Sequence, residues 1–184
     1  MVLYLSWDLT VLQNLTVLQM KQIFYSLIYP YIFYTILAWR SAYKTNIDKI
    51  QTKQYHSARL IFFATSYGEH TESAFPLLNL LDVLTVHNVY RCQILKFTYL
   101  WHKGLLPKLF SNYFQFASYV HKYNTRYSSK LSLYVKNLRT NTGKQTIGYA
   151  TCIIWDKIPL NLKELNIYQF SKQLKPYLLS EQHS

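Results

Sequence analysis

Residues 86–107 read VHNVYRCQILKFTYLWHKGLLP, and this stretch decides the fold class. Its apolar side chains recur every three or four residues, which is the period of an α-helix with one buried face. Gly104 and Pro107 follow them in the order typical of a helix end. The stretch therefore predicts a long helix that ends at about His102. The positions that define its buried face are Val86, Val89, Tyr90, Ile94, Phe97 and Leu100.

The same period continues on both sides of this helix. Pro30 suits the start of a helical segment, and Pro159 should break one. In the last predicted helix, Phe170, Leu174 and Leu178 share one face and should point inward. The further helices are predicted over about residues 10–29, 30–41, 46–61, 155–165 and 167–179.

The pattern changes between residues 131 and 151. Leu131, Leu133 and Val135 alternate with other residues, as in a half-buried strand. Asn141-Thr142-Gly143 is a turn signal, and residues 145–151 could form the returning strand. The predicted fold is therefore mainly α, a helical bundle with a small β-hairpin near the C-terminus.

The charge of the chain is large and unevenly distributed. Lysine and arginine total 20 against 8 acids, which gives a net charge of +12 over 184 residues. Residues 83–155 contain no acid and ten basic side chains, so this segment alone carries +10. A field of one sign favours a polyanionic partner such as nucleic acid or an anionic membrane surface. A basic, solvated face without a partner is the alternative.

Residues 22–39 form an uncharged run that could suggest a membrane span. Its four tyrosines and Pro30 disfavour that interpretation, because tyrosine prefers the membrane interface. A buried helix with a break is the favoured alternative, a membrane partner is not favoured, and an intracellular location is expected. Cys92 and Cys152 are too few for a disulfide scaffold, and no His/Cys set has zinc spacing, so no metal or cofactor is expected.

A series of short motifs resembles the region that follows the polymerase domain in LINE-type (non-LTR, jockey-like) retrotransposon reverse transcriptases. The resemblance covers about residues 15–179 and leaves residues 1–14 unmatched. It implies a helical thumb-like region (15–110). A C-terminal region (111–184) follows, with a basic loop, the β-hairpin and the last helices. The motifs, in family order, are Phe24-Tyr25-Ser26-Leu27-Ile28-Tyr29-Pro30-Tyr31, Ile50-Gln51-x-x-Gln54-x-x-x-x-Arg59, His70-Thr71-Glu72, Gly104-Leu105-Leu106-Pro107, Tyr123-Asn124-Thr125-Arg126, Arg139-Thr140-Asn141-Thr142-Gly143-Lys144 and Trp155-Asp156-Lys157-Ile158-Pro159.

The resemblance implies a thumb-and-linker segment that grips template–primer duplex. The Asp-Asp pair that holds catalytic Mg²⁺ in the family is absent from this sequence, so a non-catalytic segment is expected. RNA or RNA–DNA hybrid, bound without sequence preference, is the expected partner, and the polymerase palm is a second one. A membrane-associated protein anchored by residues 22–39 and an inert, decayed fragment are the alternatives. The candidate nucleic-acid-binding residues are Lys96, Lys103, Lys122, Tyr123, Arg126, Tyr127, Lys130, Arg139 and Lys144.

Overall fold

The computed structural model describes residues 16–34, 36–39, 44–65, 78–79, 81–120 and 131–183. These residues are mostly helical, as the sequence predicts, and they contain no named strand. Contacts divide the chain into two compact units. Unit 1 comprises residues 1–34 and 42–86, and unit 2 comprises residues 35–41 and 87–184.

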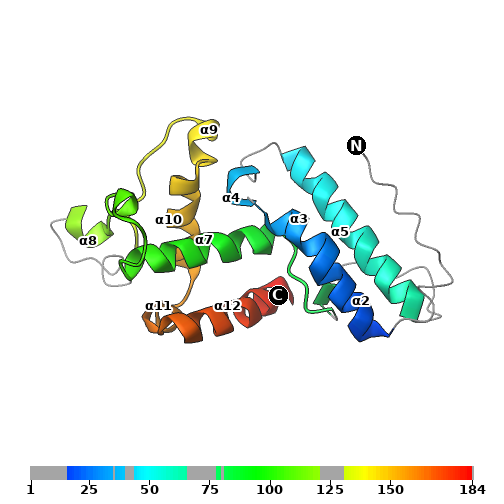
Figure 1. Cartoon of the computed structure of the whole chain (residues 1–184). Helices are drawn as coiled ribbons and strands as arrows, with labels where there is room; N and C mark the ends of the chain where they lie inside the picture. Colours follow the sequence, from blue (N-terminus) through cyan, green and yellow to red (C-terminus); the bar gives the residue numbers. More distant parts are fainter. Residues whose placement is uncertain are drawn as a thin grey trace. The chain divides into compact units, whose positions relative to one another are not determined.

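In unit 1, one helical run lies beside a long helix (Figure 1). The run consists of α2 (Val17–Ile23), the π-helix η1 (Phe24–Ile28) and α3 (Tyr29–Phe33), and the long helix is α5 (Lys44–Thr65). The π-helical turn directly precedes Pro30, which has no N–H to donate and would clash with the carbonyl four residues earlier. The predicted segment from Pro30 to about residue 41 is interrupted, because Tyr34 has extended backbone before α4 (Ile36–Trp39).

Two glutamines of α5 hold the segment that leads into the next helix. The Nε2 of Gln54, whose side chain is buried, donates to the Leu84 carbonyl at 2.8 Å. The Oε1 of Gln51 accepts from the backbone N–H of Val86 at 2.9 Å, and the two amide groups bond each other at 2.8 Å. The Gln51-x-x-Gln54 spacing thus places both amides on one helix face, where they satisfy backbone groups.

The core of unit 1 is small and apolar. Phe24, Ala58, Leu78, Leu81 and Val83 are buried together, and tyrosines from the π-helical run and α5 pack against them. The turn before Val83 is closed by a hydrogen bond from its N–H to the Leu78 carbonyl at 2.8 Å. A second anchor is an ion pair between Lys21 and Asp82 at 2.7 Å.

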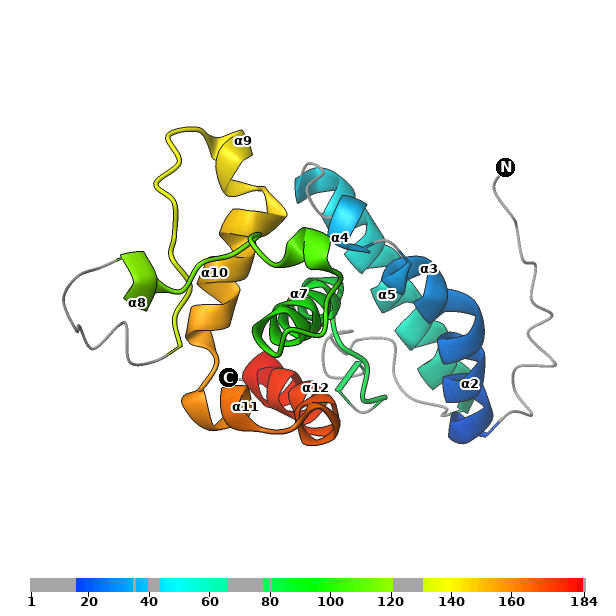
Figure 2. The ribbon, with the colours of Figure 1, turned by 60° about the vertical axis from the view of Figure 1, so that its left-hand side comes forward.

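Unit 2 is built around α7 (Val86–His102), whose first residue still belongs to unit 1. Figures 1 and 2 show α10 and α12 beside α7 in both views. Apart from α4, most of the other elements of unit 2 are short, but α12 is as long as α7. These elements are η2 (Lys108–Phe110), α8 (Ala117–Val120), α9 (Asn141–Lys144), α10 (Ile147–Lys157), α11 (Leu160–Glu164) and α12 (Ile167–His183).

The packing of α7 against α12 confirms the predicted helix faces. Phe170, Leu174 and Leu178 of α12 are all buried. The Phe170 ring stacks on Tyr99 of α7 with centroids 4.1 Å apart, and the Tyr99 hydroxyl donates to the Leu165 carbonyl. The predicted helix end is also confirmed, since α7 stops at His102 and Gly104 adopts a φ of +68° that side chains disfavour.

The predicted β-hairpin is wrong. Asn141-Thr142-Gly143 begins the helical turn α9 instead of a hairpin turn, and residues 147–157 form α10. Two threonine N-caps account for this difference: the Thr140 Oγ1 accepts from the Gly143 N–H, and the Thr146 Oγ1 from the Tyr149 N–H. Burial of Thr151, Cys152 and Trp155 gives α10 a helical rather than an alternating inner face.

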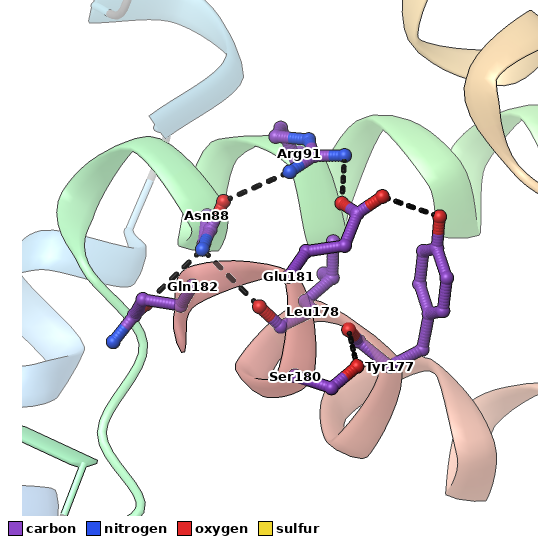
Figure 3. A network of polar contacts seen from close by, with 7 residues as sticks. All are labelled: Asn88, Arg91, Tyr177, Leu178, Ser180, Glu181 and Gln182. Atoms are coloured by element: carbon purple, nitrogen blue, oxygen red, sulfur yellow. Dashed lines mark hydrogen bonds and ion pairs between the residues drawn. The ribbon is translucent and has the colours of Figure 1, made fainter. Parts of the chain in front are cut away.

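A polar network joins the first turns of α7 to the end of α12 (Figure 3). Glu181 accepts from Arg91 and from the Tyr177 hydroxyl, each at 2.5 Å. Arg91 also donates to Asn88 Oδ1, and Asn88 Nδ2 donates to the Leu178 carbonyl and to Gln182. Because each bond joins groups that would otherwise need water, the network fixes the register of α12 on α7.

This network predicts loss of stability at both extremes of pH. Burial, then the Glu181 hydrogen bond and charge, raise the pKa of Tyr177 to about 12 from 10.0, so its contribution is complete below pH 10 and lost towards pH 12. Burial would raise the pKa of Glu181, but hydrogen bonds from Tyr177 and Arg91 outweigh it and lower the pKa below 4.5. The Glu181 contribution is therefore complete above pH 4.5 and lost as the pH falls through the folded-state pKa.

Thermal melting measured across pH follows both the acid and the alkaline loss of stability. We expect Tyr177→Phe to lose less stability than the wild type between pH 10 and pH 12, because the tyrosine ionisation is removed. The loss that other groups cause should remain. If the variant and the wild type lost stability in parallel above pH 10, the role assigned to Tyr177 would be contradicted.

Candidate nucleic-acid interface

The structure describes four of the nine candidate residues. Lys96 lies half-buried on α7, Lys103 is exposed just beyond its end, and Arg139 and Lys144 are exposed before and within α9. The other five lie outside the described residues: Lys122, Tyr123, Arg126, Tyr127 and Lys130.

Among the described residues, an antiparallel bridge joins Phe116 to Leu133 in the two segments that flank residues 121–130. The Tyr134 N–H donates to the Gln115 carbonyl at 2.8 Å, and the Ala117 N–H donates to the Ser132 carbonyl at 2.9 Å. These bonds hold residues 132–134 beside residues 115–117. The two described segments of the acid-free stretch on either side of residues 121–130 are therefore hydrogen-bonded to each other.

Alternation beyond the bridge puts two polar side chains on the surface. Leu133 is buried and Val135 half-buried, whereas Tyr134 and Lys136 are exposed. Neither Lys136 nor Tyr134 is among the candidates predicted from the sequence, although the apolar half of this alternation is visible there. The signal that could have found them was the same period, because residues between inward positions point outward.

Arg139 and Lys144 flank the short helical turn α9. The Thr140 Oγ1 accepts from the Gly143 N–H at 3.1 Å, which closes the turn between the two basic residues. A Cβ added to Gly143 would lie 3.0 Å from that hydroxyl oxygen and 3.4 Å from the Leu138 side chain, so a larger residue here would have to push these groups outward. We call the exposed residues Tyr134, Lys136, Arg139 and Lys144 the basic segment.

Among the described residues, no carboxylate forms an ion pair with the basic segment. The acids of unit 2 are Asp156, Glu164 and Glu181, all of them later in the sequence. Asp156 accepts from the Ser132 hydroxyl, and Glu181 is neutralised by Arg91. The positive charge of the basic segment is thus available to a ligand.

The rings that interleave the charges divide into core and surface. Tyr99 and Phe114 are buried, and Trp101 is half-buried and donates its indole N–H to the Ser111 carbonyl. Tyr113 and Tyr119 are exposed, by 50% and 83%. Only surface rings can stack on a base, so the tyrosines, rather than the tryptophan or the phenylalanine, are the candidates.

Lys103 and Lys96 are less free than the basic segment. The Lys103 Nζ lies 5.4 Å from the centroid of the Tyr99 ring, within cation–π distance. Lys96 is half-buried and its charge acts on Cys92. Lys103 thus already contacts an aromatic ring of unit 2, and Lys96 is less exposed than the basic segment.

Burial shifts His102, Cys92 and Cys152 of unit 2 toward their neutral forms. Burial, then the charges of Lys103 and Lys163, lower the pKa of His102. Burial raises the pKa of Cys152 to about 11 and also raises that of Cys92. At pH 7 these side chains are therefore neutral, and no cluster of three or more metal-ligating side chains occurs in the part of the chain that the structure describes.

Within the described residues, none of the helices combines the length and apolarity needed to cross a membrane. Residues 22–39, the run considered for a span, include the break at Tyr34.

Compared with known proteins, the chain matches no family model, no curated protein and no solved structure.

Proposed function

We propose that the chain is a non-catalytic segment that binds RNA or RNA–DNA hybrid through phosphate contacts, as the resemblance to the region after a non-LTR reverse transcriptase polymerase domain implies. The observation that carries the proposal is the basic segment, where Lys136, Arg139 and Lys144 are all exposed without an acidic partner among the described residues. Phosphate contacts of this kind provide affinity and no sequence information.

The chemistry of the basic segment suits a nucleic-acid backbone. Arg139 presents a planar fork that can donate two parallel hydrogen bonds to one phosphate, and the lysines act as point charges. Tyr134 is 37% exposed and lies close to Lys136 in the same extended stretch, so a partly exposed ring accompanies the charges. An interface of this composition does not distinguish sequences, which fits a duplex grip.

A matched pair of triple variants tests the proposal. Lys136→Gln/Arg139→Gln/Lys144→Gln removes two lysines and one arginine from the basic segment. Lys49→Gln/Lys53→Gln/Arg59→Gln removes the same charges from the exposed face of α5. We expect the first variant to weaken binding of a labelled RNA–DNA hybrid by about tenfold or more at 0.1 M salt, because three released counterions are lost.

The α5 variant serves as the control for net charge, because it also lowers the charge of the chain by three. Its affinity should stay within about threefold of wild type, since only long-range attraction changes. Equal loss in both variants would show that net charge, not the basic segment, accounts for binding. Absence of wild-type binding at low salt would refute the proposed function.

A further inference from the structure

A second surface of unit 2, between α11 and α12, lies away from the basic segment in sequence. Here the chain forms an open groove of about 750 Å³, which is within the usual range of small-molecule sites. Its walls come from the α11 turn, the loop at Asn166 and the outer face of α12. None of the lining residues is acidic.

Two asparagines that line the groove each accept a hydrogen bond from a nearby backbone N–H. The Asn161 Oδ1 accepts from the Leu162 N–H at 3.0 Å, and the Asn166 Oδ1 accepts from the Gln169 N–H at 2.8 Å. Each asparagine also carries an NH₂ group that can donate a hydrogen bond to a ligand. Lys172 adds a positive charge to the same groove.

Aromatic and backbone groups complete the surface. Tyr168 is 72% exposed, and the Tyr177 ring is held in place by its hydroxyl, which donates to Glu181. Pro176 lies within α12 and has no N–H to donate to the Lys172 carbonyl, which leaves an acceptor on this face. The groove therefore combines a free ring, several donors, one acceptor and one cation.

We propose that this groove binds an unpaired nucleotide of single-stranded RNA or DNA. The base would stack on Tyr168, its polar edge would meet the asparagine amides, and its phosphate would lie at Lys172. A duplex cannot use such a site, because its bases are already stacked and paired. The inference rests on the proposed function and adds a second, single-strand contact to it.

Binding of a labelled twelve-residue oligouridylate to the full chain tests the groove, with RNA–DNA hybrid as the parallel ligand. We expect Tyr168→Ala to weaken oligouridylate binding by about fivefold to a hundredfold, as loss of one stacked base does, and to change hybrid binding less than about twofold. Tyr168→Phe should bind like wild type. Tyr31→Ala, at a tyrosine that is 79% exposed in unit 1, is the matched control and should have no effect.

The two proposals fail in different ways. Unchanged oligouridylate binding by Tyr168→Ala would overturn the groove and leave the proposed function standing. If wild type bound the RNA–DNA hybrid but not oligouridylate, the groove proposal would also be overturned and the proposed function would stand. If wild type bound neither ligand, both proposals would fall. Circular dichroism of each variant verifies that the helix content of the wild type is retained.

Discussion

Replacing Trp155 with alanine is expected to destabilise unit 2 by about 3–5 kcal/mol, the range for removing a buried aromatic side chain. Trp155 is completely buried on α10 and donates its indole N–H to the Leu131 carbonyl at 2.9 Å. The Lys163 Nζ lies 5.3 Å from the centroid of its ring. The substitution therefore both opens a cavity and leaves the Leu131 carbonyl without its indole donor.

Urea denaturation followed by circular dichroism measures this loss. Ile153→Ala is the control on the same helix, where the side chain is 37% exposed, and it should cost less than about 1 kcal/mol. Trp155→Phe should fall between the two, because it retains a ring but loses the indole hydrogen bond. A cost below about 1 kcal/mol for Trp155→Ala would contradict the central place of Trp155 in the unit 2 core.

Replacing Arg91 with methionine should cost about 1.5–3 kcal/mol, the range for a hydrogen bond to a charged group. The Arg91 and Glu181 side chains are 14% and 33% exposed, so solvent screens the pair only in part. The variant leaves the Glu181 carboxylate with Tyr177 as its remaining partner in the network of Figure 3. The same urea experiment measures the effect.

A double variant separates the lost interaction from the penalty of an unpaired charge. Arg91→Met/Glu181→Met removes both partners and should be more stable than Arg91→Met alone, because no carboxylate is then left without its cation. Glu164→Gln, an exposed acid of unit 2, is the control and should stay within about 0.5 kcal/mol of wild type. Additive effects of the two substitutions would contradict the coupling of Arg91 and Glu181.

The helices were predictable because their signals are local. The period of α7, the Gly104 stop and the inward face of α12 all follow from spacing along one element. The helices α9 and α10 were not predictable in this way, because the sequence Asn141-Thr142-Gly143 is compatible with both a hairpin turn and a helix start. Caps at Thr140 and Thr146, and burial of the α10 face, decided between the two.

The candidate site was only partly predictable. The sequence gives the number and spacing of basic residues, but it does not give the solvent exposure of each side chain. Lys163, one of the twenty basic residues, is 1% exposed beside Trp155, whereas Lys136 is exposed in the basic segment. Tyr99 and Tyr134 likewise differ in burial although both interleave basic residues. Which side chain faces solvent depends on packing between elements, which no local pattern contains.

The salt dependence of hybrid binding tests the central claim most directly. Affinity of wild type and of Lys136→Gln/Arg139→Gln/Lys144→Gln would be measured by fluorescence anisotropy from 50 to 300 mM salt. The account predicts that log K falls steeply with log salt for wild type, and that the variant lowers the magnitude of the slope by about three, one per lost phosphate contact. The same slope for both proteins would contradict phosphate binding by the basic segment.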